Sequence, residues 1–155
     1  MSNQYLDLNS IGEALKQNLE VSVLTSGVSM RPMLRQHRDI VVIERVNREL
    51  KKGDVVAYPG GKDKYTLHRI IKIKNGNLII RGDNNYFTEK NVKREDIVGI
   101  LKEFYRDGKY INCKTNKRYR VYTVYILSSY PLRYFWCRKL KPFLARIKHF
   151  LLKSN

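Results

Sequence analysis

The sequence predicts a mostly β domain with a few short helices, followed by a basic, amphipathic C-terminal tail. Turn signals recur between short stretches rich in β-branched residues, a pattern typical of antiparallel sheets. The strongest of these signals is Asn75-Gly76, which predicts a tight hairpin. The expected strands cover residues 21–25, 39–46, 55–58, 65–73, 78–81 and 97–104, and Asp107-Gly108 is expected to start one further hairpin.

Helices are expected near the two ends of the chain. Ser10 and Glu13 fit a capping box, which predicts a short helix that begins at Ser10 and runs to about Asn18. Residues 138–153 place apolar side chains at helical spacing among Lys and Arg, which predicts a basic amphipathic helix.

We divide the chain into a β domain at residues 1–117 and an aromatic-rich, basic tail at residues 118–155. Residues 121–132 carry no charge, but the stretch is shorter than the ~20 apolar residues that span a bilayer. Residues 1–20 hold no apolar run that ends in a small-residue cleavage site, so no targeting segment is expected there.

Positive charge is concentrated in the C-terminal part of the chain. The sequence has 31 Lys and Arg against 14 Asp and Glu, for a net charge of +17. Twelve of the basic residues and none of the acidic ones lie in residues 108–155. A segment with only basic charges indicates contact with an anionic surface, either membrane headgroups or nucleic acid.

The two cysteines predict neither a disulfide framework nor a zinc site. Cys113 and Cys137 are too few for the first, and their separation fits no zinc-ligand spacing. We interpret them as two unrelated thiols.

Three short segments hold residues that could carry chemistry. Ser29 follows the flexible Gly27 and precedes Pro32, which favours a turn that starts a helix and leaves the Ser29 N–H free to face an oxyanion. On these residues alone, a plain loop with a capping serine is the commoner structure. His68 lies in an expected strand whose neighbouring Arg69 faces the opposite side, and Asp83 lies just past the next strand.

Taken in order, these segments resemble one family. The motifs are, in chain order, SGVSM, RP, ML, KKGDVV, LHRI, RGDNN and EDIVG. Over about residues 21–101 they resemble the serine peptidases of the signal peptidase I family. The resemblance implies the β fold that this family shares with the self-cleaving repressors. It implies Ser29 as nucleophile, and His68, in the place of the lysine base of the bacterial enzymes, as general base. This pairing is similar to the endoplasmic-reticulum and archaeal branch.

The resemblance also assigns the residues around this pair. Asp83 matches the acid that orients the histidine, and Glu89 is the candidate for a second acid that often lies a few residues further on. Met30 and Pro32 are expected to shape the site. The Ser29 N–H is expected to form the oxyanion hole, with Ser26 or its neighbours helping, because Gly27 stands where part of the family has a donor serine.

No cofactor or metal is expected, because a histidine accepts a proton at neutral pH without heavy tuning. Lys64 and Lys72, which flank His68, are the alternative bases, although Lys72 lies about 13 Å along the strand.

The expected function is a serine endopeptidase that cleaves a leader or signal segment from a precursor peptide or preprotein. The tail, through residues 133–153, is expected to contact an anionic membrane surface, so that the protein is peripherally membrane-associated. The side of the membrane is left open, the cytoplasmic side included. Packing of the tail on the β domain is an equal alternative.

Two other functions fit parts of the pattern. An inactive peptidase-fold module could bind lipid or nucleic acid through its basic tail, although nucleic acid is not the partner we expect. A relative of the self-cleaving repressors would use a Ser–Lys pair and a helix-turn-helix domain, for which residues 1–20 are too short.

Overall fold

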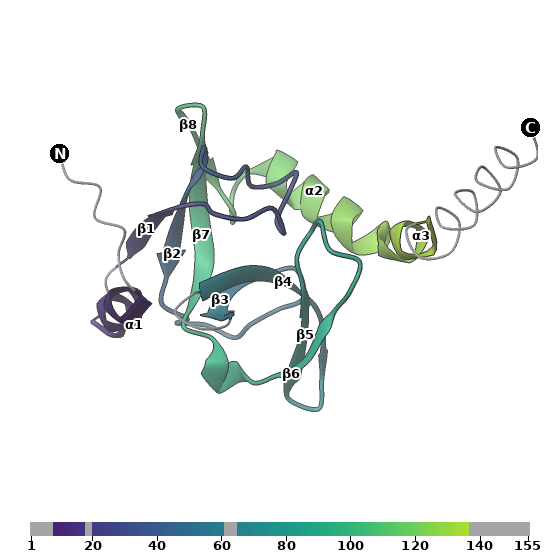
Figure 1. Cartoon of the computed structure of the whole chain (residues 1–155), viewed down its shortest axis with the longest axis horizontal. Coiled ribbons are helices and arrows are strands. Elements are labelled where there is room, and N and C mark those ends of the chain that lie inside the picture. Colours follow the sequence, from purple (N-terminus) through teal and green to yellow (C-terminus); the bar gives the residue numbers. More distant parts are fainter. Residues whose placement is uncertain (1–7, 18–19, 61–64, 137–155) are drawn as a thin grey trace, which may run out of the picture.

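The computed structural model describes residues 8–17, 20–60 and 65–136. Within them the chain is mostly β, with one antiparallel sheet that curls on itself and short helices around it (Figure 1). The strands are β1 (Val21–Leu24), β2 (Ile40–Glu44), β3 (Val55–Pro59), β4 (Tyr65–Lys74), β5 (Asn77–Arg81), β6 (Glu89–Val92), β7 (Gly99–Arg106) and β8 (Lys109–Asn112). Their order is β1-β2-β7-β3-β4-β5-β6, and β8 pairs with β7.

The expected strands and hairpins are confirmed, with ends that differ by one to two residues. Asn75-Gly76 turns β4 into β5, and Asp107-Gly108 turns β7 into β8. Strand β6 was not predicted, because three of its four residues, EKNV, are polar and they show no strand alternation.

The helices are α1 (Leu8–Lys16), the short 3-10 helix η1 (Arg94–Asp96), α2 (Lys117–Ser128) and α3 (Tyr130–Phe135). The helix expected from Ser10 exists, but Ser10 lies inside it, so its prediction as the N-cap is wrong. None of the described helices is long and apolar enough to cross a membrane. The helix expected at 138–153 lies outside the described residues.

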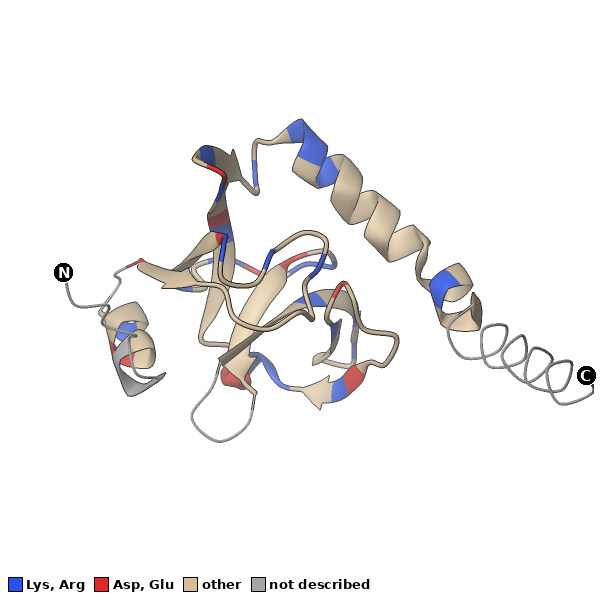
Figure 2. Ribbon diagram, turned by 45° about the horizontal axis from the view of Figure 1, so that its top comes forward, with Lys and Arg blue, Asp and Glu red and all other residues tan. Residues whose placement is uncertain are grey.

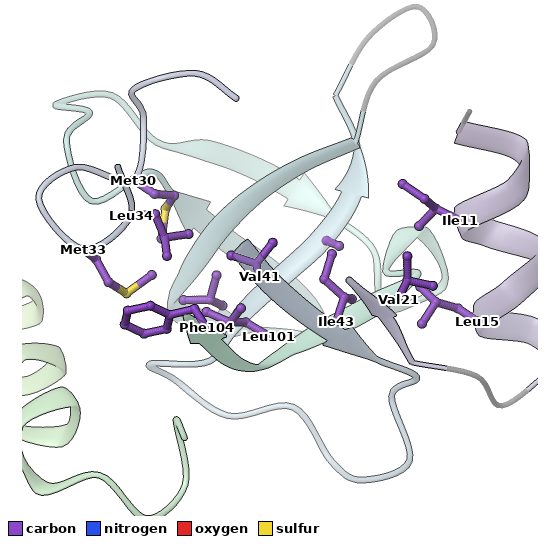
Figure 3. Packing of buried hydrophobic residues seen from close by; sticks show 12 residues of the cluster. Ile11, Leu15, Val21, Met30, Met33, Leu34, Val41, Ile43, Leu101 and Phe104 are labelled. Carbon is purple, nitrogen blue, oxygen red and sulfur yellow. The ribbon is translucent and has the colours of Figure 1, made fainter. Parts of the chain in front are cut away.

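The core has two parts, one on each face of the curled sheet. Strand alternation sends Val55 and Ala57 to one part and Val56 and Tyr58 to the other. Figure 3 shows the first part, where α1 closes one end and the segment after β1 closes the other. Its labelled members are Ile11, Leu15, Val21, Met30, Met33, Leu34, Val41, Ile43, Leu101 and Phe104.

A buried ion pair attaches α2 to the sheet. Arg69 on β4 is 1% exposed, and its guanidinium donates two parallel hydrogen bonds, of 2.7 and 2.8 Å, to the carboxylate of Asp83. Tyr122 of α2 donates to the same carboxylate at 3.0 Å. Arg69 also lies against the ring of Tyr119, one turn earlier on α2. The first half of the segment predicted as a tail is therefore part of the folded domain.

Cys113 lies next to α2 and has a free thiol. Burial raises the pKa of this thiol to about 12, so it stays protonated and unreactive at neutral pH. Cys137 lies outside the described residues.

Removing the charge of Asp83 should destabilise the whole domain. Asp83→Asn leaves the Arg69 guanidinium buried without a counter-charge, which costs about 3–5 kcal/mol of unfolding free energy. The measurement is urea unfolding followed by far-UV circular dichroism. The matched control is Glu95→Gln, which removes the same kind of charge from the exposed Lys93–Glu95 pair and should leave the unfolding midpoint unchanged. Equal effects of the two variants would contradict the role given to Asp83.

Candidate active site

Ser29 lies in the connection between β1 and β2. Because these two strands pair directly, the connection must fold back on itself, and the Thr25 N–H donates to the Asp39 carbonyl where it closes. The Thr25 hydroxyl lies 2.9 Å from that same carbonyl oxygen and 2.7 Å from the Arg35 carbonyl oxygen, so its single proton is shared between the two. The result is a compact loop of turns with Ser29 half-buried in it.

Both sides of this loop are fixed. Met30, Met33 and Leu34 are buried in the core that Figure 3 shows. On the other side, Asp39 is fully buried and accepts hydrogen bonds from the side chains of Arg35 and Arg106. Burial opposes the charge of Asp39, but these two guanidinium groups lower its pKa and keep it ionised.

The prediction that Ser29 starts a helix is wrong. The segment forms isolated turns, in which the N–H of Arg31 donates to Val28 and that of Leu34 donates to Met30. The Arg31–Pro32 peptide bond is cis, and Pro32 is exposed. Any oxyanion site at Ser29 therefore depends on single N–H groups, without the field of a helix end.

His68 lies on β4 with a side chain that is only 5% exposed. Its Nδ1 is 2.9 Å from the phenolic oxygen of Tyr58 and 2.9 Å from Oε1 of Glu89. Tyr58 in turn donates a hydrogen bond of 2.8 Å to Oε2 of Glu89. The three side chains therefore form a closed triangle of polar contacts.

Proton accounting assigns the histidine tautomer. Burial first, and then Glu89, raise the pKa of Tyr58, so that its hydroxyl keeps its single proton and gives it to Glu89. Both atoms that face Nδ1 are then acceptors, which requires the proton on Nδ1. Nε2 is left as an acceptor, and it has no hydrogen-bond partner among the residues that the structure describes.

The same surroundings set the charge of His68. Burial lowers its pKa, and the Glu89 carboxylate opposes this effect without overcoming it. The imidazole is therefore neutral at neutral pH, as a general base must be.

The strand register brings Ser29 to the same face as His68. Arg69 of β4 pairs with Arg81 of β5, so continuing the register by one residue places Gly82 opposite His68. A Cβ built on Gly82 would lie 2.9 Å from Cβ of Ser29 and 2.7 Å from its carbonyl oxygen. Ser29 thus fills the space that a side chain at 82 would take, beside His68. Its hydroxyl has no hydrogen-bond partner within the described part of the chain.

Asp83 lies on the opposite face. It follows Gly82 by one residue, and its carboxylate binds Arg69 and Tyr122. The structure thus differs from the prediction that Asp83 orients His68, because alternation sends neighbouring side chains to opposite faces. Glu89, the candidate for the second acid, makes that contact instead. Sequence reasoning missed Tyr58, which only the pairing of β3 with β4 brings to His68.

The remaining predicted site residues lie around the serine loop. Ser26 and Gly27 are exposed, and Gly27 has a φ of +84°, which a glycine adopts without strain. Met30 is 5% exposed and anchors the loop in the core. The Ser29 N–H donates no hydrogen bond within the described residues, so it is free for an oxyanion.

The backbone beyond Gly82 holds Ser29 in place. The Asn84 N–H donates to the Ser29 carbonyl at 2.7 Å, and its side-chain amide donates to the Val28 carbonyl at 3.2 Å. Lys72, an alternative base, lies four residues along β4 from His68, and Lys64 lies outside the described residues. The described residues include no cluster of His, Cys, Asp and Glu that could hold a metal ion.

Comparison with known proteins adds no family. No family model matches the sequence, and no curated protein matches it. The family resemblance therefore rests on the ordered motifs, and the proposal below rests on those motifs together with the site geometry.

The pKa of His68 provides a test of this geometry. In a proton NMR titration, His68 should titrate below 6.5, because burial disfavours the imidazolium. Glu89→Gln should lower that pKa further, since it removes the charge that favours the protonated form. Glu95→Gln is the control and should leave it unchanged. A rise in the His68 pKa on removal of the Glu89 charge would exclude the contact between the two side chains.

Proposed function

We propose that the protein is a serine endopeptidase of signal peptidase type, with Ser29 as nucleophile and His68 as general base. The observation that carries the proposal is the unpartnered pair of a half-buried serine hydroxyl and a histidine Nε2 on one face of the sheet. The contacts of Nδ1 with Tyr58 and Glu89 support it, because they hold the imidazole in the tautomer that accepts a proton at Nε2.

The residues would act in the order usual for acyl transfer. The Ser29 hydroxyl gives its proton to Nε2 of His68 while its oxygen attacks the scissile carbonyl carbon. The oxyanion that forms accepts a hydrogen bond from the Ser29 N–H. When the C–N bond breaks, His68 returns the proton to the leaving amine. Water then gives a proton to Nε2 and attacks the acyl-enzyme, which releases the acid and restores Ser29.

Glu89 acts through His68. Its carboxylate stabilises the imidazolium that forms during each step, and Tyr58 fixes the carboxylate through its hydrogen bond. Asp83 has a separate task in this proposal. It positions Arg69 and α2, and it keeps the 82–85 segment in place against the serine loop.

The proposed substrate is a precursor peptide or preprotein with small side chains beside the cleaved bond, as the resemblance implies. The alternative is an inactive module that binds lipid or nucleic acid, and it assigns no task to Ser29 and His68. Neither the Ser29 hydroxyl nor Nε2 of His68 has an internal partner in the described residues, so both atoms are available to a substrate, as the peptidase proposal requires.

Cleavage of a precursor peptide with an Ala-x-Ala site tests the proposal. Ser29→Ala and His68→Ala should each lower the rate by about 10³-fold or more, because each removes a partner in the first proton transfer. Ser22→Ala, at an exposed serine of β1, is the control and should cleave at the wild-type rate. Equal cleavage by wild type and Ser29→Ala would contradict the proposal.

Glu89 and Tyr58 should affect the rate in a fixed order. Glu89→Gln removes the charge that stabilises the imidazolium and should lower kcat by about 10²-fold or more. Tyr58→Phe should cost less, since Nδ1 keeps its 2.9 Å contact with Glu89. The measurement is the pH profile of kcat in the two variants. A normal kcat in Glu89→Gln would show that the carboxylate has no part in proton transfer.

A further inference from the structure

The outer face of α2 and α3 is apolar, although no described residue covers it. Val121 is 70% exposed, Val124 is 67% exposed and Leu132 is 76% exposed. Val121 and Val124 are three residues apart and lie on one side of α2, and Leu132 is exposed on the next helix, α3; we call this surface the apolar stripe. Tyr125 on α2, Phe135 on α3 and Trp136 directly after α3 are also more than half exposed. Single exposed apolar residues are ordinary, but this many on two consecutive helices indicate a binding surface.

The opposite side of α2 accounts for the contacts with the domain. Tyr119, Tyr122 and Thr123 contact Arg69 and Asp83, and Ile126 is 2% exposed. The apolar stripe is therefore not a misplaced core face, because the core face of the helix is already occupied.

Basic residues flank the stripe, and acidic ones do not occur on either helix. Lys117, Arg118 and Arg120 lie in the first turn of α2, and Arg133 lies on α3 (Figure 2). No Asp or Glu occurs from residue 108 to the end of the sequence. An apolar stripe with cationic flanks and aromatic side chains at one end is complementary to the interface of an anionic lipid membrane.

We propose that this outer face of α2 and α3 docks on an anionic phospholipid surface. A second copy of the chain is the poorer occupant, because a symmetric contact would bring the same basic residues of both copies together. Nucleic acid is poorer still, since the centre of the stripe has no charge.

Three contacts join α3 to residues 81–86, so a membrane bound at α3 would lie close to the candidate active site. Tyr130 of α3 donates a hydrogen bond to the Tyr86 carbonyl, and Arg133 donates one to the Asp83 carbonyl. The Arg81 guanidinium lies 3.5 Å from the centre of the Tyr130 ring. Residues 82–86 thus connect α3 with the Ser29 loop. If the proposed peptidase function holds, its substrate is a precursor held at the membrane surface.

Trp136, the single tryptophan of the chain, reports on docking directly. The full chain is titrated with vesicles of equal parts phosphatidylcholine and phosphatidylglycerol. The Trp136 emission should shift to shorter wavelength, and the shift should be much smaller with pure phosphatidylcholine. Salt at 1 M, which shortens the Debye length to about 3 Å, should reverse most of the binding.

The decisive variant is Val121→Asp with Val124→Asp, which keeps Trp136. It should weaken vesicle binding at least about tenfold, because both charges would have to enter the interface. The matched control is Ile40→Asp with Ile73→Asp, at two exposed positions of the sheet, and it should bind as wild type. Circular dichroism checks that both variants fold, and no substrate is needed, so the result does not depend on the peptidase proposal.

Three results would overturn the inference. One is the absence of any Trp136 shift with anionic vesicles. Another is vesicle binding that Val121→Asp with Val124→Asp leaves intact, which would assign the lipid contact to another part of the chain. The third is a concentration-dependent shift without vesicles that this variant abolishes, which would assign the stripe to a second copy.

Discussion

The ion pair between Arg69 and Asp83 is the interaction on which most of the structure depends. Burial opposes the charge of Arg69, but Asp83 raises its pKa, so the guanidinium stays charged inside the domain. It then binds groups from distant parts of the chain, namely the Gly53 carbonyl, the Met33 sulfur and the hydroxyl groups of Tyr119 and Thr123. Because a buried charge needs all its partners, this pair fixes the helix, the serine loop and the sheet relative to one another.

Strand alternation separates this structural pair from the candidate catalytic one. Arg69 and Asp83 occupy one face of the β4–β5 edge, whereas His68 and Ser29 occupy the other. Two carboxylates thus have different tasks, although both follow β5 closely in sequence. One neutralises a buried cation, and the other, Glu89, is partly exposed and holds Nδ1 of a neutral histidine. The Arg69–Asp83 ion pair holds the backbone of β4 and of the segment after β5, and this same backbone positions His68 and Ser29.

Much of this arrangement follows from the sequence, and the rest depends on register. Hairpin signals such as Asn75-Gly76 and the β-branched runs predicted the strands, because both act locally. The ordered motifs predicted Ser29 and His68 as candidate site residues. Whether Asp83 or Glu89 contacts His68 depends on the face of the sheet that each side chain occupies after Gly82, and no local sequence pattern predicts that face. Tyr58 was missed for the same reason, since it meets His68 only through the pairing of two strands. Helix α2 was not predicted, because apolar and aromatic residues occur on both its inner and its outer side and leave no helical period in the sequence.

The protonation of the His68 ring at neutral pH tests the central claim most directly. Nitrogen-15 NMR distinguishes a protonated ring nitrogen from an unprotonated one, and selective labelling of histidine makes both visible. The contacts of Tyr58 and Glu89 predict a proton on Nδ1 and none on Nε2. A neutral ring with its proton on Nε2 would contradict the account, because that nitrogen could not then accept the proton of Ser29.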